Sequence, residues 1–230
     1  VKFPYMDNYN YHKGMKGIIQ ELKVLLKTKS IGTNSDRALL LDFQATLETK
    51  PEKAIKLEKD ALAQIENITA DNARLVSNLH ANLGGLYRMN GHPDLAREHM
   101  EKSISLLDQF NLLHINDSIP QIANYAMFLT EQQEPERGIS ELQKLSGIIK
   151  EYHSDDCLDY AKVQETLGTI YLMTANLPQA KTHFKRAFKI YEKIWADEPE
   201  MIEAKYQEIQ ELYPQIGFCI GKNLSGLLTK

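Results

Sequence analysis

The chain repeats its own pattern every 42 residues, and this period constrains the fold more than any other feature. The first landmark is an apolar residue that opens a short segment, and it recurs at Leu41, Leu83, Tyr125 and Leu167. The second landmark is a proline, found with the same step at Pro51, Pro93 and Pro135, and one residue late at Pro178. Because two landmarks share one period, we expect four copies of a single structural unit.

Each unit has the pattern of two helices joined by a short turn. In the fourth unit, one helical face collects apolar residues at the spacing i, i+4, i+7 and i+8, namely Val163, Leu167, Ile170 and Tyr171. After Asn176-Leu177-Pro178, a second stripe follows at Ala180, Phe184, Ala187, Ile190, Tyr191 and Ile194. Proline suits the first turn of a helix, because an N–H there has no partner within the helix. The pattern therefore predicts a helical hairpin in each unit.

Small residues recur on both helices of the unit. Those on the first helix directly follow the landmark, at Gly84, Ala126 and Gly168, and those on the second lie at Ala54, Ala96, Gly138 and Ala180. We expect larger side chains to fill the space opposite them, namely Tyr87, Met100, Leu142, Tyr171 and Phe184. The predicted fold class is all-α, a right-handed α-solenoid in which each helix-turn-helix unit packs only against its neighbours.

Two segments carry a family resemblance. Leu83-Gly84-x-x-Tyr87 with Ala96-x-x-x-Met100, and Leu167-Gly168-x-x-Tyr171 with Ala180-x-x-x-Phe184, resemble the tetratricopeptide repeat. The common form has about 34 residues, so the longer period is similar to that of kinesin light chain repeats and of repeats behind some signalling ATPase modules. The first unit departs from the pattern, with Asp42 and Glu58 where the family places small and aromatic residues. Residues 113–117 also lack the His-Pro signature of kinesin light chain linkers.

The repeats organise the whole chain as a single solenoid spanning residues 1–230, with four units in residues 35–195. Residues 1–30 are expected to form a partial N-terminal repeat helix, because an apolar stripe runs through Met15, Ile18, Ile19, Leu22 and Leu25. Residues 199–230 are expected to form capping helices, with residues 216–220 packed back on the array. An array that begins in the middle of a repeat favours a piece of a longer protein with further domains.

Composition argues against several classes of protein. A net charge of −4 and a pI near 6.0 disfavour a nucleic-acid-binding surface, and the basic strip at Lys181–Lys189 is interpreted as a solvated helix face. No apolar run approaches the length that a membrane span needs. Two separated cysteines, Cys157 and Cys219, fit buried thiols in a reducing compartment. We therefore expect a cytoplasmic protein with no nucleic-acid partner and no membrane association.

No motif indicates catalysis, a metal or a cofactor. Gly14-x-x-Gly17 lacks the Lys-Ser/Thr of a phosphate-binding loop, and His92 and His99 have no further ligand set around them. Asp155-Asp156 is expected at a helix start, where exposed N–H groups favour carboxylates. Cys157 has no histidine partner in the sequence pattern. We therefore predict that the chain is not an enzyme.

The candidate binding residues come from the first helices, which in tetratricopeptide arrays line a concave groove. The second unit offers Asn78, Asn82, Gly85, Arg88 and Met89, the third offers Asn124, Met127 and Glu131, and the fourth offers Lys162, Thr166, Thr169 and Met173. The resemblance implies that Asn82 and Asn124 contact a peptide main chain, although each could instead bond a neighbouring helix. The methionines would form an adaptable lining or belong to the core, and Arg88 and Lys162 would hold carboxylates or remain solvated.

These residues predict a non-catalytic module that binds a peptide or a partner's helix in its groove. The alternative is a sensor or autoinhibitory arm of a larger signalling ATPase or transcription regulator. An effector domain elsewhere in the same full-length chain would favour that alternative.

Overall fold

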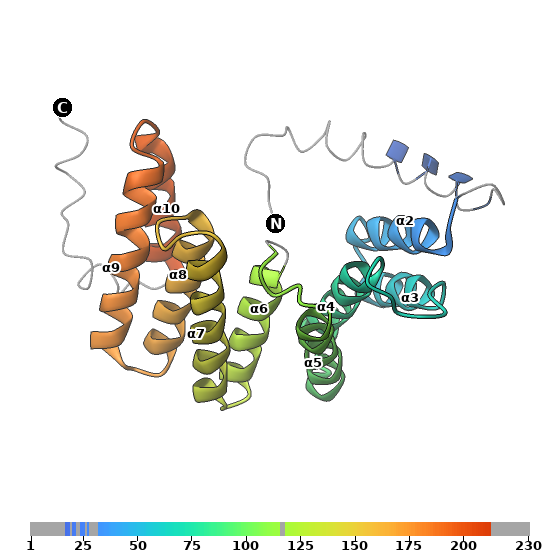
Figure 1. Ribbon diagram of the computed structural model, residues 1–230, viewed down its shortest axis with the longest axis horizontal. Helices are drawn as coiled ribbons and strands as arrows, with labels where there is room; N and C mark the ends of the chain where they lie inside the picture. The colour runs from blue at the N-terminus through green and yellow to red at the C-terminus, as the bar shows by residue number, and fades with distance from the viewer. Residues whose placement is uncertain are drawn as a thin grey trace. The chain divides into compact units, whose positions relative to one another are not determined.

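The computed structural model describes residues 32–115 and 118–212, together with residues 17, 18, 20, 21, 24, 25 and 27. Over these residues the regular structure is helical, without strands (Figure 1). The elements are α2 (Asn34–Thr46), α3 (Pro51–Leu62), α4 (Ala73–Met89), α5 (Pro93–Gln109), α6 (Ser118–Glu131), α7 (Pro135–Tyr152), α8 (Leu158–Met173), α9 (Leu177–Ile194) and α10 (Pro199–Leu212). The all-α class and the helix-turn-helix repeats are therefore confirmed.

The chain divides into two compact units, Val1–Leu112 and Leu113–Lys230. In the first unit, α2 pairs with α3, α4 pairs with α5, and α4 also packs against α2 and α3. In the second unit, α6 pairs with α7, α8 pairs with α9, and α8 also packs against α6 and α7. The helix α10 follows and packs against α9.

The 42-residue period holds more strictly in the helices than in the prolines. The second helices begin at residues 51, 93, 135 and 177, so each start lies 42 residues after the one before. Pro178 is late in the sequence only because it is the second residue of α9, where its missing N–H again has no helical acceptor. The period also continues into α10, where the buried Ile209 lies 42 residues after Leu167.

A left-handed residue ends the first helix of three successive hairpins. Gly91, Gln133 and Ala175 have φ angles of 75°, 64° and 59° and follow one another at the same 42-residue step. In each turn the next N–H bonds back to the first helix, as in His92 N to Tyr87 O at 2.9 Å. This bond belongs to the Schellman motif, which favours glycine because an L side chain is strained at positive φ. Gln133 and Ala175 adopt the conformation without that advantage.

Close packing of small against large residues holds the hairpins together. A Cβ built on Gly84 would lie 2.5 Å from Met100 Cγ, and one built on Gly168 would lie 2.9 Å from the Phe184 ring. Both predicted pairs are therefore in contact. The third hairpin differs. A Cβ built on Gly138 of α7 would lie 2.6 Å from the backbone carbonyl oxygen of Ala126 in α6. Here the glycine lies on the second helix and meets backbone rather than a large side chain.

Some expectations concern residues outside those described. They include most of the N-terminal stripe (Met15, Ile19 and Leu22), Asn116-Asp117, the segment at residues 216–220 and Cys219. The boundaries 1–30 and 199–230 therefore stay predictions. Within the described residues, no helix has both the length and the apolar character needed to cross a lipid bilayer.

Candidate functional site

Equivalent positions on the first helices of the N-terminal unit are open to solvent. Leu39 and Phe43 of α2 lie 42 residues before Ala81 and Gly85 of α4, and they are 54% and 44% exposed. A Cβ built on Gly85 would meet nothing within 4 Å, so this side of α4 is open. We define the α2–α4 face as Leu39, Phe43, Asn78, Asn82 and Gly85.

Sequence reasoning found the α4 side of this face and missed the α2 side. Leu39 and Phe43 are four residues apart, so they share one face of α2. The signal that could have identified them was their repeat position, which matches that of the candidates in α4. Met89, at the end of α4, is 81% exposed and therefore does not belong to the core. Arg88 beside it is half-buried.

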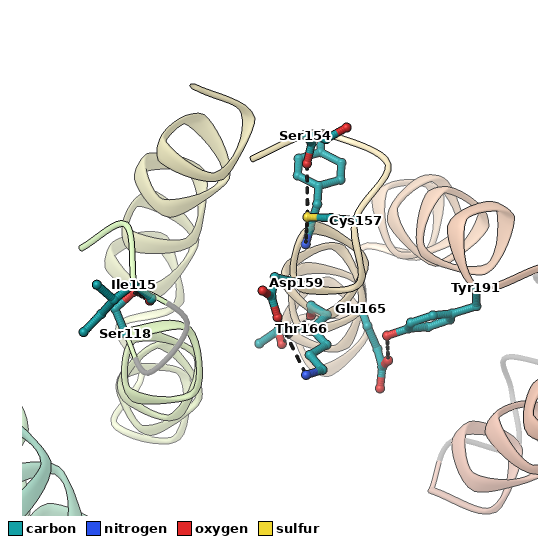
Figure 2. A network of polar contacts seen from close by, with 10 residues as sticks. Ile115, Ser118, Ser154, Cys157, Asp159, Glu165, Thr166 and Tyr191 are labelled. Atoms are coloured by element: carbon teal, nitrogen blue, oxygen red, sulfur yellow. Dashed lines mark hydrogen bonds and ion pairs between the residues drawn. The ribbon is translucent and has the colours of Figure 1, made fainter. Parts of the chain in front are cut away.

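The predicted binding residues of the second unit lie on α6 and α8. Asn124 and Met173 are exposed, and Met127 is half-buried. Lys162 lies 3.8 Å from the carboxylate of Asp159, one turn earlier in α8 (Figure 2). The hydroxyls of Thr166 and Thr169 donate to the carbonyls of Lys162 and Glu165 at 2.9 and 3.1 Å. Because each hydroxyl proton is used inside the helix, these threonines offer a ligand mainly acceptor oxygens.

Glu165, in the same helix, is bound by other helices of this unit. Its carboxylate accepts a hydrogen bond of 2.6 Å from the Tyr191 hydroxyl of α9, which Figure 2 shows beside α8. Lys205 of α10 forms an ion pair with it at 2.9 Å. Burial, followed by the negative charge of Glu165, raises the pKa of Tyr191, so the phenol stays a donor. These bonds join α8, α9 and α10, and the sequence pattern did not indicate them.

The most unusual polar group lies inside the first hairpin. Asp42 and Glu58 occupy the positions that Gly84 and Met100 hold one repeat later, and Glu58 is only 1% exposed. The side-chain nitrogen of Asn82 donates to Asp42 Oδ1 at 2.8 Å and to Glu58 Oε1 at 3.1 Å. Burial, reinforced by the adjacent Asp42, raises the pKa of Glu58 to about 9. Burial also raises the pKa of Asp42. The pair therefore retains a proton at neutral pH.

Asn82 is thus bonded to neighbouring helices, which was one of the two roles considered for it. Asn82 and Asn124 are expected to have equivalent roles, but the residues at the positions facing them differ. The positions that correspond to Asp42 and Glu58 for Asn124 hold Gly84 and Met100, neither of which offers a carboxylate. Asn82 therefore has two carboxylate partners that the repeat pattern does not supply to Asn124.

A second polar feature recurs in two hairpins. His99 stacks on Tyr87 with ring centroids 5.5 Å apart, and His183 stacks on Tyr171 at 5.3 Å. His99 Nδ1 lies 2.9 Å from His80 Nδ1, so one proton is shared between the two rings. His183 Nδ1 instead lies 2.9 Å from Gln164 Oε1 and donates to it. Burial, with His99 and then Lys102 nearby, lowers the pKa of His80 to about 4.

The start of α8 involves the cysteine and the acidic residues noted in the sequence. Cys157 is the N-cap of α8, where its sulfur accepts from Tyr160 N at 3.4 Å and donates to Ser154 O at 3.1 Å (Figure 2). The two aspartates precede this cap, and Asp156 pairs with Lys193. Over the described part of the chain, no three His, Cys, Asp or Glu side chains come together as a metal site.

Comparison with protein families finds a match for the central and C-terminal repeats. Residues 118–193 match the model of the tetratricopeptide repeat. This match confirms the predicted resemblance. Repeats of this family are typically non-catalytic and generally form protein–protein interaction modules. No curated protein matches the chain.

Solved structures show the same fold at low sequence identity. BtubC (BKLC) from P. vanneervenii has a TM-score of 0.65 at 19% identity, covering 79% of this chain and 72% of its own. A putative kinesin light chain from Podosopora anserina, with nearly identical TPR-like repeats, has a TM-score of 0.65 at 13% identity, covering 81% and 92%. MamA has a TM-score of 0.55 at 17% identity, covering 82% and 97%.

Proposed function

Because the chain is built of tetratricopeptide-type repeats, we propose that it is a non-catalytic module that binds an extended peptide segment of a protein partner. In the N-terminal unit the peptide lies on the α2–α4 face. In the second unit, Asn124, Met127, Lys162, Thr166, Thr169 and Met173 have the corresponding role. Each unit supplies its own binding face in this proposal.

The observation that carries the proposal is the exposure of Leu39 and Phe43 on α2, together with the open backbone at Gly85, which holds the position of Phe43 one repeat later. Apolar side chains on the solvent side of a helix gain free energy when a ligand covers them, at about 25 cal/mol per Å². Gly85 lets a ligand backbone approach α4 closely, because no side chain projects there. Apolar anchors on one helix and a position open to a ligand backbone on the next suit an extended chain.

The test uses peptides selected from a random phage-displayed library against the whole protein. Phe43→Ala should weaken binding of a selected peptide by about 10- to 100-fold, because a central aromatic anchor typically contributes about 1.5–3 kcal/mol. Leu95→Ala is the matched control. Leu95 belongs to the same unit and is 39% exposed, but it lies on the second helix α5. Equal losses from both variants, or no loss from Phe43→Ala, would reject the proposed face.

A further inference from the structure

The orientation of the Asn82 amide follows from its partners. Asp42 Oδ1 and Glu58 Oε1 both lie within hydrogen-bond distance of the same atom, Asn82 Nδ2. An ionised carboxylate only accepts hydrogen bonds, whereas an amide nitrogen carries two protons to donate. The nitrogen therefore faces the carboxyl pair and uses both protons there. Turning the amide over would place its carbonyl against one oxygen of each carboxyl group, and the single proton that the pair retains could bond to it from only one of them.

The opposite end of the amide remains available to a ligand. No hydrogen bond joins Asn82 Oδ1 to another residue of the described ranges. Among described residues, the buried side-chain atoms without a partner are Glu58 Oε2 and His114 Nδ1, and Asn82 Oδ1 is not one of them. The Asn82 side chain is half-buried and belongs to the α2–α4 face. Its carbonyl oxygen is therefore an acceptor that solvent can reach, on the same α2–α4 face as Leu39 and Phe43.

The carboxyl pair makes a poor substitute for the packing found in other hairpins. Asp42 and Glu58 share a hydrogen bond, but no donor from outside the pair reaches the buried Glu58 Oε2, which costs free energy because a buried polar atom loses its hydration. At the equivalent positions, Gly84 and Met100 fill the same space without polar atoms. A buried polar pair is therefore difficult to explain by stability alone. Its visible effect is to hold the Asn82 amide in one orientation.

We propose that Asp42 and Glu58 are positioning residues that fix Asn82 as a hydrogen-bond acceptor, so that the α2–α4 face recognises a backbone N–H of the bound peptide. This inference rests on the proposed peptide-binding function. An Asn that could rotate would donate to a C=O of the ligand in one orientation and accept from an N–H in the other. The held Asn accepts only a donor, and the ligand residue opposite it cannot be proline, which has no N–H.

The experiment is a backbone N-methylation scan of a peptide selected from the phage-displayed library, with dissociation constants from fluorescence anisotropy. Methylation removes one N–H at a time. At one position it should weaken binding to the wild-type protein by about tenfold, because one lost hydrogen bond to a partly buried acceptor costs about 1–2 kcal/mol. Asn82→Ala should show no further loss at that position. A full penalty retained in Asn82→Ala would overturn the assignment.

Two further variants separate positioning from folding. The double variant Asp42→Ala with Glu58→Met copies the small and large residues of the later repeats, so it should fold as stably as the wild type. It releases the Asn82 nitrogen and should reduce the N-methyl penalty to about twofold or less. Glu58→Gln keeps a neutral acceptor oxygen for Asn82 and should retain the full penalty. An unchanged penalty in the double variant would overturn the positioning role.

The two proposals fail in different ways. If Phe43→Ala leaves the affinity of the selected peptides unchanged, both the proposed face and this inference are rejected. Peptides that need Phe43 but show no N-methyl penalty shared with Asn82 would leave the binding face standing and reject the acceptor role.

Discussion

One pair of facing positions in the repeat is polar in the first hairpin and apolar in the fourth. In the fourth, Gly168 lets the fully buried ring of Phe184 pack against the backbone of α8. In the first, the equivalent residues are Asp42 and Glu58, bonded to Asn82 of the following helix. The same helical hairpin forms in both cases. The hairpin therefore tolerates either chemistry. The choice between them determines which polar groups of the neighbouring helix are already bonded within the protein.

The energetic basis of the two arrangements differs. A buried phenyl ring stabilises through the apolar area removed from water and through close packing. A buried carboxyl pair must recover its lost hydration through hydrogen bonds, and no donor from outside the pair reaches Glu58 Oε2. We therefore expect substitutions in the fourth hairpin to change stability and substitutions in the first to change mainly pH dependence and binding.

Removing the ring from the fourth hairpin is the strongest test of this comparison. Phe184→Ala should destabilise the second unit by about 3–5 kcal/mol, because the deletion leaves a cavity in a core that cannot fully collapse. Urea unfolding followed by circular dichroism measures the change. Leu177→Ala, at an exposed leucine of the same helix, is the control and should change stability by less than about 1 kcal/mol. Similar losses in both variants would contradict the packing described.

Adding a side chain at Gly168, which faces Phe184 from α8, should reduce stability by a smaller amount. Gly168→Leu should destabilise by about 1–3 kcal/mol, because a Cβ there already lies 2.9 Å from the Phe184 ring. Gly147→Leu is a matched control within the same unit, since a Cβ at Gly147 meets nothing within 4 Å. Thermal melts of the two variants should differ clearly. A Gly168→Leu protein as stable as Gly147→Leu would show that the contact is easily relieved.

The first hairpin should lose stability as the pH rises. The pKa of Glu58 is raised from 4.5 to about 9 in the folded state, so the folded protein binds a proton that the unfolded chain releases. The stabilisation is complete below pH 4.5 and is lost as the pH rises towards 9, by up to about 1.4 kcal/mol per pH unit. Hydrogen exchange of the α2 and α3 amides, corrected for intrinsic rates, reports this local stability. Glu58→Gln should remove this slope, and a slope that persists would reject the assignment.

The smallest expected effect concerns the turns that connect the paired helices. Ala175→Gly should stabilise the second unit by about 0.5–1 kcal/mol, because glycine adopts the φ of 59° without strain. The reverse change, Gly91→Ala, should destabilise the first unit by about 1 kcal/mol, since its φ is 75°. Chemical denaturation compares the two. Opposite signs are expected, and two changes of the same sign would contradict a shared turn geometry.

The repeat could be predicted from the sequence, because a helical period and a proline at a helix start are local properties of a few neighbouring residues. The 42-residue step, the paired helices and the contacts of Gly84 with Met100 and of Gly168 with Phe184 all follow from spacing. The departure at Asp42 and Glu58 was also visible as a break in the pattern. Its consequence for Asn82, which bonds to both carboxyl groups, was not visible in the sequence.

The bonds from Asn82 to Asp42, 40 residues away, and to Glu58 depend on the tertiary packing and could not be predicted. The same holds for the exposure of Leu39 and Phe43 and for the close approach of Gly138 to the Ala126 carbonyl. The physical reason is that periodicity specifies which face of a helix is apolar, whereas hydrogen-bond partners depend on how three helices place their side chains within about 3 Å of one another. Differences of that size are set by packing among helices, which no spacing along the chain records.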